Sequence, residues 1–281
     1  MAPYDGVAIW QAFVLGIVEG LTEFLPISST GHLTIAEKLL RLQIDDPAVT
    51  GFTAVIQVGA IAAVIVYFWR DLWRIAVAWV RGLAQAERRR DFDYRFGWYI
   101  IVGSIPILVV GFLGRGLVAG PLRSLWVVAI ALIAWSAVMV VAELVATQER
   151  REAEVTFTDS LIVGLVQCVA LVPGVSRSGA TISTGLFRGL DRVTATRLSF
   201  FLSIPALVAA GLYELKDAVH GTVGVAPLAV GTIVSFVVAY ATVAWLLRFV
   251  AHHSIVWFVG YRVALGGVLV VLLALGVMAP R

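Results

Sequence analysis

Long apolar stretches alternate with short polar ones along most of this chain. A helix needs about 20 apolar residues to cross the ~30 Å hydrocarbon core of a bilayer. Windows of that length predict six spans, at residues 50–69, 97–114, 122–144, 196–215, 225–247 and 258–278. The pattern therefore predicts an all-α polytopic membrane protein.

Two further apolar stretches, residues 8–44 and 158–190, are each interrupted near the middle by a cluster of Pro, Gly and hydroxyl residues. In the first stretch, Trp10–Leu25 would reach only ~24 Å as a helix, at 1.5 Å per residue. That length falls short of the hydrocarbon core. We predict that each stretch is a re-entrant hairpin of two half-helices.

The two halves of the chain resemble each other at a constant offset of 148 positions. The offset relates hydroxyl, glycine and apolar positions alike: Gly16 and Gly164, Val18 and Val166, Ser28 and Ser176, Gly31 and Gly179, Leu42 and Leu190, Phe52 and Phe200. It predicts one membrane domain built of repeat 1 (residues 1–148) and repeat 2 (149–281), each a hairpin followed by three spans. An odd number of crossings gives the two repeats inverted topology.

Composition agrees with a membrane protein, since 60% of the 281 residues are hydrophobic and 14% charged. Soluble domains carry about a quarter charged residues. The one cysteine, Cys168, excludes an intrachain disulfide. No basic run alternates with aromatic residues, so we expect no nucleic acid partner. The net charge of +3 suits anionic membrane lipids.

The basic residues are distributed unevenly between the two sides that the spans define. Fourteen fall on one side: Arg70, Arg74, Arg81, Arg88, Arg89, Arg90, Arg95, Arg150, Arg151, Arg188, Arg192, Arg197, Arg248 and Arg262. Six fall on the other: Lys38, Arg41, Arg115, Arg123, Lys216 and Arg281. The richer side is cytoplasmic by the positive-inside rule. The first hairpin then opens outward, and residues 70–95 form a polar, interfacial loop.

Two carboxylates lie inside the first apolar stretch. Glu19 and Glu23 are four positions apart, so they share one face of a helix. They can be interfacial carboxylates that face water. Because a carboxylate at membrane depth is costly, the pair also indicates a general base or a site for Mg²⁺ or Ca²⁺, which prefer oxygen ligands.

The first loop, Pro26–His32, follows these carboxylates. Pro26 stops the first half-helix, and Ser28 or Ser29 is suited to cap the next one. A helix that begins at this depth points free N–H groups at an anion. His32 lies one turn beyond the serines and either faces the same point or is a hydrogen-bonded structural residue. Thr30 adds a third hydroxyl.

The second loop, Pro173–Thr181, matches the first under the same offset. Arg177 stands where the first loop has Ser29, between the hydroxyls of Ser176, Ser178 and Thr181. Arg177 either pairs with one of the glutamates or binds a phosphate through its planar fork. Together the loops fit phosphoryl transfer on an anionic substrate, and a site reached through the membrane indicates a lipid-borne phosphate.

Residues Glu19–His32 and Pro173–Thr181 resemble the two signatures of the bacterial undecaprenyl-diphosphate phosphatases linked to bacitracin resistance. Chain length and span pattern are similar too, so the resemblance covers essentially the whole chain. It implies hydrolysis of undecaprenyl diphosphate to undecaprenyl phosphate and phosphate, with a divalent cation as cofactor. It also places Glu19, Glu23, Ser29, His32 and Arg177 at active-site positions.

On this basis we expect Ser29 to attack the terminal phosphorus, with Glu23 or His32 as base and Arg177 on the phosphoryl group; His32 as nucleophile stays open. Glu19 and Glu23 are the expected metal ligands. The expected substrate contacts are Ser28, Thr30, Ser176, Ser178 and Thr181. A polyprenyl diphosphate lipid is the expected partner, in a bacterial inner membrane with the site facing the periplasm, and a homodimer is left open. The alternative is a lipid-phosphate transporter or flippase on the same scaffold.

Overall fold

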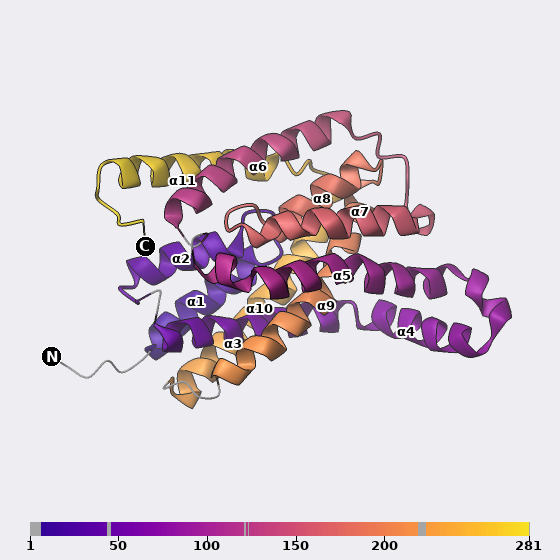
Figure 1. Cartoon of the computed structure of the whole chain (residues 1–281), viewed down its shortest axis with the longest axis horizontal. Helices are drawn as coiled ribbons and strands as arrows, with labels where there is room; N and C mark the ends of the chain where they lie inside the picture. The colour runs from indigo at the N-terminus through magenta and orange to yellow at the C-terminus, as the bar shows by residue number, and fades with distance from the viewer. Residues whose placement is uncertain (1–6, 44–45, 121, 123, 219–222, 281) are drawn as a thin grey trace.

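Helices make up nearly all of the part of the chain that the computed structural model describes, residues 7–43, 46–120, 122, 124–218 and 223–280 (Figure 1). The α-helices are α1 (Ile9–Thr22), α2 (Ser29–Leu39), α3 (Pro47–Tyr67), α4 (Trp69–Ala84), α5 (Phe92–Ala119), α6 (Leu125–Val145), α7 (Phe157–Gln167), α8 (Arg177–Phe187), α9 (Arg192–Ala218), α10 (Val225–Val250) and α11 (Trp257–Ala274). Short 3₁₀ turns η1 (Ala86–Arg90), η3 (Glu152–Glu154) and η4 (Cys168–Leu171) join some of them.

Six of these helices are long and apolar enough to cross a membrane. The spans are Ala48–Tyr67, Phe92–Gly114, Leu125–Val145, Arg192–Leu212, Val225–Val250 and Trp257–Ala274. Each overlaps one of the six predicted windows, and the ends differ by a few residues. The prediction of an all-α polytopic membrane protein is confirmed.

Four of the five shorter helices form two matching pairs, α1–α2 and α7–α8, and the fifth is α4. Helices α2 and α8 each have 11 residues and begin at positions that the offset of 148 relates. The helix α1 packs on α10, and α7 packs on α5, the corresponding span of the other half. The reading of the pairs as re-entrant hairpins, and of residues 1–148 and 149–281 as inverted repeats, stays a prediction that this geometry supports.

Glycines allow the short helices to approach the spans closely. A Cβ on Gly164 of α7 would lie 1.9 Å from the carbonyl oxygen of Gly103 on α5. A Cβ on Gly16, its counterpart on α1, would lie 2.6 Å from the carbonyl oxygen of Gly231 on α10. Only glycine fits at these two contacts, which set the depth at which each hairpin is held in the bundle.

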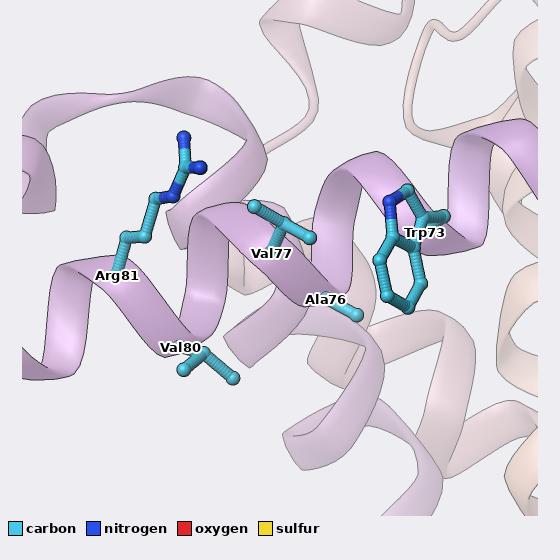
Figure 2. Close-up of a pocket in the computed structure, with 5 residues that line it drawn as sticks. All are labelled: Trp73, Ala76, Val77, Val80 and Arg81. Atoms are coloured by element: carbon cyan, nitrogen blue, oxygen red, sulfur yellow. The ribbon is translucent and has the colours of Figure 1, made fainter.

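The predicted polar loop at residues 70–95 is wrong in its first part, because residues 69–84 form the helix α4. Its outer face carries a shallow groove lined by Trp73, Ala76, Val77, Val80 and Arg81 (Figure 2). These positions recur at helical spacing, so that one face is apolar although arginines interrupt the sequence. In Figure 1, α4 runs beside the start of α5 at one end of the bundle, away from the loops between the short helices.

Arg262 does not lie at the cytoplasmic surface, where span counting placed it. It is fully buried in α11, so thirteen of the fourteen basic residues remain on that side, still more than twice the other six. Of those six, Arg115, Arg123, Lys216 and Arg281 lie outside the residues whose side chains the structure describes.

Candidate active site

The two signature loops, which the sequence predicts to meet, are in direct contact. The Gly174 amide of the second loop donates a hydrogen bond to Ser28 Oγ of the first at 3.0 Å. In return, Ser178 Oγ donates to the Leu25 carbonyl at 2.9 Å, and Ser176 Oγ does so at 3.5 Å. We call residues 23–29 and 173–178 together the loop junction. Its members come from opposite halves of the chain.

Each loop turns into its helix through a serine with left-handed backbone geometry. Ser28 and Ser176 both have φ of 76°, which is uncommon outside glycine. As N-caps, they accept hydrogen bonds from the amides of Gly31 and Gly179, so that of the two predicted cap candidates, Ser28 and Ser29, it is Ser28 that caps α2. The next residue is therefore the first of a helix, a position where N–H groups are free to bind an anion.

Those next residues are Ser29 and Arg177, and Glu23 joins them. Ser29 Oγ donates to Glu23 Oε2 at 2.5 Å, and Arg177 Nη2 donates to Glu23 Oε1 at 3.0 Å. Glu23 caps the end of α1 and is buried. The adjacent Phe24 anchors it, packed edge-on against Phe200 of α9 at 5.4 Å. The hydroxyl, the carboxylate and the guanidinium thus form one hydrogen-bonded chain, Ser29–Glu23–Arg177.

The other guanidinium nitrogen of Arg177 is available to a ligand. Its Nη1 atom is buried and has no hydrogen-bond partner among the described atoms. Glu23 and Glu19 both interact electrostatically with Arg177. Glu19 lies one turn before Glu23 on α1 and is almost fully buried. The expected pairing of Arg177 with a glutamate is therefore present, and it leaves one edge of the fork for an anion.

His32 is hydrogen-bonded to residues outside the chain Ser29–Glu23–Arg177. Its Nδ1 lies 2.7 Å from the Ser28 carbonyl, and its Nε2 lies 2.6 Å from the Tyr261 hydroxyl of α11. Because a carbonyl only accepts, Nδ1 carries the proton and the neutral Nε2 accepts from Tyr261. Both ring nitrogens are thus engaged, and their hydrogen-bond partners are Ser28 and Tyr261 rather than Ser29 or Glu23.

The expected substrate hydroxyls mostly serve the loop junction. Ser28, Ser176 and Ser178 make the contacts between loops given above, and all three are buried. Thr181 Oγ1 donates to the Arg177 carbonyl at 2.8 Å and to Ser199 Oγ at 2.6 Å. Thr30 is exposed. Their role as direct contacts of the substrate stays a prediction.

Sequence reasoning missed Tyr261 and Arg262, the two residues of α11 at the site. Tyr261 holds His32, and Arg262 donates to carbonyls of both loops, Pro26 at 2.8 Å and Gly174 at 3.0 Å. A signal for Arg262 was available, because a lone arginine inside an apolar span is a functional candidate by default.

The residues at the site partly fit the divalent cation that the resemblance implies. Glu19 and Glu23 present carboxylates from successive turns of α1, the donor type that Mg²⁺ and Ca²⁺ prefer. Within the described ranges, no three His, Cys, Asp or Glu side chains converge. Since these ions take about six or more oxygen ligands, a cation here also needs oxygens from the substrate and water.

Known sequences match nearly the whole chain. The chain is 60% identical over 273 residues to undecaprenyl-diphosphatase 1 of Frankia alni, covering 97% of this chain and 98% of that protein. It is 58% identical to undecaprenyl-diphosphatase 1 of Streptomyces avermitilis (97% and 99% covered) and 52% identical to undecaprenyl-diphosphatase of Cutibacterium acnes (92% and 95%). Residues 12–268 match the sequence model of bacitracin resistance protein BacA. The chain belongs to the BacA family.

Proposed function

We propose that this protein removes the terminal phosphate of undecaprenyl diphosphate, releasing undecaprenyl phosphate and inorganic phosphate. The observation that carries the proposal is the chain Ser29–Glu23–Arg177, in which a nucleophile contacts a base and the base contacts a phosphate-binding cation. Membership of the BacA family and relatives named undecaprenyl-diphosphatase support the substrate. The names of these relatives do not favour the transporter alternative.

In the first step, Ser29 Oγ attacks the terminal phosphorus and passes its proton to Glu23 Oε2, with which it already shares a 2.5 Å hydrogen bond. The bond between that phosphorus and the bridging oxygen breaks, and undecaprenyl phosphate leaves with the bond's electron pair. The product on the enzyme is phosphoserine. Positioned nucleophile–base pairs of this kind are the usual means of activating a serine.

In the second step, water attacks the phosphorus of the phosphoserine and the bond from that phosphorus to Ser29 Oγ breaks. Glu23, protonated in the first step, returns its proton to Ser29 Oγ, and the oxygen of the water leaves as part of inorganic phosphate. Arg177 stabilises the charge on the phosphoryl oxygens in both steps, through Nη1 and the free amides at the starts of α2 and α8. Glu23 fixes the opposite edge of that guanidinium. The fork is therefore oriented before substrate binds.

A divalent cation would be held by Glu19, Glu23 and diphosphate oxygens. When bound, it would offset negative charge on the diphosphate and its leaving group. The protein's own residues bind and orient the phosphates and move the proton. Ser29 is favoured over His32 as nucleophile, because Ser29 contacts a carboxylate base whereas His32 is engaged by Ser28 and Tyr261.

We further propose that the site opens to the periplasmic side of the bacterial inner membrane. The support is the distribution of basic residues, thirteen of which gather on the side away from the first hairpin. A membrane site is also where the polyprenyl tail of the substrate remains in lipid while its diphosphate reaches the loop junction. Assembly as a homodimer stays an expectation.

The test is release of phosphate from a prenyl diphosphate by the purified protein in detergent with Mg²⁺ or Ca²⁺. We expect Ser29→Ala to abolish release and Glu23→Gln to lower kcat by about 10²–10⁴-fold, the usual contribution of a general base. Ser203→Ala, which removes a hydroxyl bonded to the Phe200 carbonyl within α9, is the matched control and keeps full activity.

Mass spectrometry of the acid-quenched enzyme identifies the nucleophile. We expect a phosphate on the peptide that contains Ser29, stable to acid. A phosphate that is lost on acid treatment but remains on His32 after an alkaline quench, or full activity of Ser29→Ala, would overturn the serine mechanism. If the folded wild-type protein never releases phosphate, the hydrolase proposal itself fails and the transporter alternative gains.

A further inference from the structure

Arg262 is a buried cation whose hydrogen-bond partners are all neutral. Its exposed fraction is 0%. Nε donates to Ser136 Oγ of α6 at 3.1 Å, and the remaining contacts go to backbone carbonyls. Among the described residues, Arg262 forms no ion pair. Burying a guanidinium without a carboxylate partner costs free energy. Neutralisation of a buried negative charge therefore does not account for Arg262.

The carbonyls belong to both signature loops. Nη1 donates to Pro26 of the first loop at 2.8 Å. Nη2 donates to Gly174 at 3.0 Å and to Val175 at 3.1 Å, both in the second loop, and it lies 3.3 Å from the Leu132 carbonyl of α6. One planar group therefore joins two loops that are about 150 positions apart and ties both of them to α6.

These carbonyls are close along the chain to the reacting residues. Pro26 lies between Glu23 and Ser29, and Val175 lies two positions before Arg177. A shift of either loop would change the distances within the chain Ser29–Glu23–Arg177. In a positioned reaction a misplacement of about 1 Å costs roughly 10²-fold in rate.

We propose that Arg262 is a positioning residue for phosphoryl transfer, which holds the two loops at the separation that the reaction needs. The inference rests on the proposed function. Only arginine suits this role, because its rigid fork presents five donors in one plane whereas lysine presents three on a flexible stem. A lysine keeps the charge but cannot hold both loops at once.

The first test compares wild type with Arg262→Lys. We expect the variant to fold, with kcat lower by about 10²-fold and KM changed by less than about threefold, because positioning acts on the transition state more than on binding. The matched control is Arg197→Lys. Arg197 is another largely buried arginine, but it pairs with Asp71 and Glu152, remote from the loops, and the control should leave kcat unchanged.

A second readout needs no activity. Hydrogen exchange followed by mass spectrometry reports the protection of backbone amides in peptides covering residues 23–31 and 172–179. Arg262→Lys should speed exchange in both peptides and leave peptides of α4 unchanged, since amide protection reports local opening. If wild type lacks phosphatase activity but this loosening appears, the proposed function fails and the link between loops stands.

If Arg262→Lys does not fold, Ser136→Ala tests the positioning role of Arg262 instead. It removes only the hydroxyl that fixes Nε, so the guanidinium gains freedom and kcat should fall by about tenfold or more, as expected for one hydrogen bond from a charged group. The proposal is overturned if either folded variant keeps both wild-type kcat and wild-type exchange at the loops. It is overturned equally if kcat falls only in proportion to the fraction of folded protein.

Discussion

Two serines at the junction keep a backbone conformation that costs free energy. Left-handed geometry at a non-glycine residue costs on the order of 1–3 kcal/mol, and Ser28 and Ser176 both adopt it. Several hydrogen bonds impose it, from Gly31 and Gly174 on Ser28 and from Gly179 on Ser176. The strained backbone is therefore kept at the two turns that direct the side chains of Ser29 and Arg177 toward Glu23.

The role of His32 can be distinguished from that of Glu23 by a substitution that removes one oxygen atom, the hydroxyl of Tyr261. Tyr261→Phe frees Nε2 of His32 without touching the chain Ser29–Glu23–Arg177. We expect kcat to change by less than about tenfold, whereas loss of a general base costs about 10²–10⁴-fold. Steady-state phosphate release measures both. A loss in Tyr261→Phe as large as that in Glu23→Gln would instead assign the proton transfer to His32.

At the scale of elements, each short helix is held by a close contact and by its ends. Asp159 in the first turn of α7 is an example. Its fully buried carboxylate accepts hydrogen bonds from Arg150, Arg188 and Thr156. These bonds tie the start of α7 to the end of α8. The pair α7–α8 is thereby closed at the end opposite to the loop junction.

The closure by Asp159 should depend on pH. Burial alone would raise the pKa of Asp159, but hydrogen bonds from Arg150, Thr156 and Arg188 outweigh it and hold this pKa well below its usual value. A carboxyl with a lowered folded-state pKa stabilises the protein above its unfolded pKa, about 3.9, and loses that contribution as pH falls through the folded pKa.

We therefore expect the thermal unfolding temperature of wild type to fall as the pH drops below about 4–5. Asp159→Asn should be less stable than wild type at pH 7, with a flatter dependence on pH in that range. Unfolding curves in detergent between pH 3 and 7 measure this. Parallel profiles for the two proteins would show that other groups control acid stability.

The close contact of α7 gives a second prediction at this scale. Gly164→Ala places a Cβ against the Gly103 carbonyl, and overpacking of this kind typically costs about 1–3 kcal/mol, or more where backbone must move. We expect a lower Tm. Gly267→Ala in α11, where a Cβ meets nothing within 4 Å, is the control and should keep the wild-type Tm. Equal values for both variants would contradict the packing described.

On the scale of the whole molecule, charge is divided between the two ends. Ion pairs of Arg192 with Glu143, and of Arg197 with Asp71 and Glu152, join α9 to α6, α4 and η3. The loop junction shows a different pattern, with one ion pair and many neutral hydrogen bonds. The basic end is suited to anionic lipid head groups, and the junction to a single multivalent anion.

This division predicts which positions react from outside the cell. In a Cys168→Ala background, which removes the one native cysteine, Leu39→Cys at the exposed end of α2 should react with a membrane-impermeant maleimide added to intact cells. Arg90→Cys in η1 should react only after the membrane is opened. The reverse pattern would place the site on the cytoplasmic side.

The spans were predictable because the thickness of a bilayer imposes a length on each apolar run, whatever it packs against. The cap at Ser28 was predictable for a similar reason, since capping depends on neighbours three residues away. The helix α4 was missed because its three arginines were grouped with the arginine-rich residues that follow it as one polar loop, although Trp69, Trp73 and Val80 recur at helical spacing.

Other contacts at the site could not be predicted, because they join distant parts of the chain. Tyr261 and His32 are 229 positions apart, and Arg262 and Pro26 are 236 apart. No local pattern specifies such a pairing. Sequence also left open whether Ser29 or His32 faces Glu23, because both follow it within one loop and the contact that engages His32 comes from Tyr261 on a distant helix.

The position of Arg262 along the chain has a consequence for biosynthesis. The ribosome makes both loops before it makes α11, and Pro26 precedes Arg262 by 236 residues. At ~5–20 residues per second, roughly 10–50 s pass between them. The second loop waits a shorter time, about 4–18 s at the same rate, since Gly174 precedes Arg262 by 88 residues. Until Arg262 has been made, the carbonyls of the two loops lack the group that joins them. The catalyst is complete only when its last described helix has been inserted.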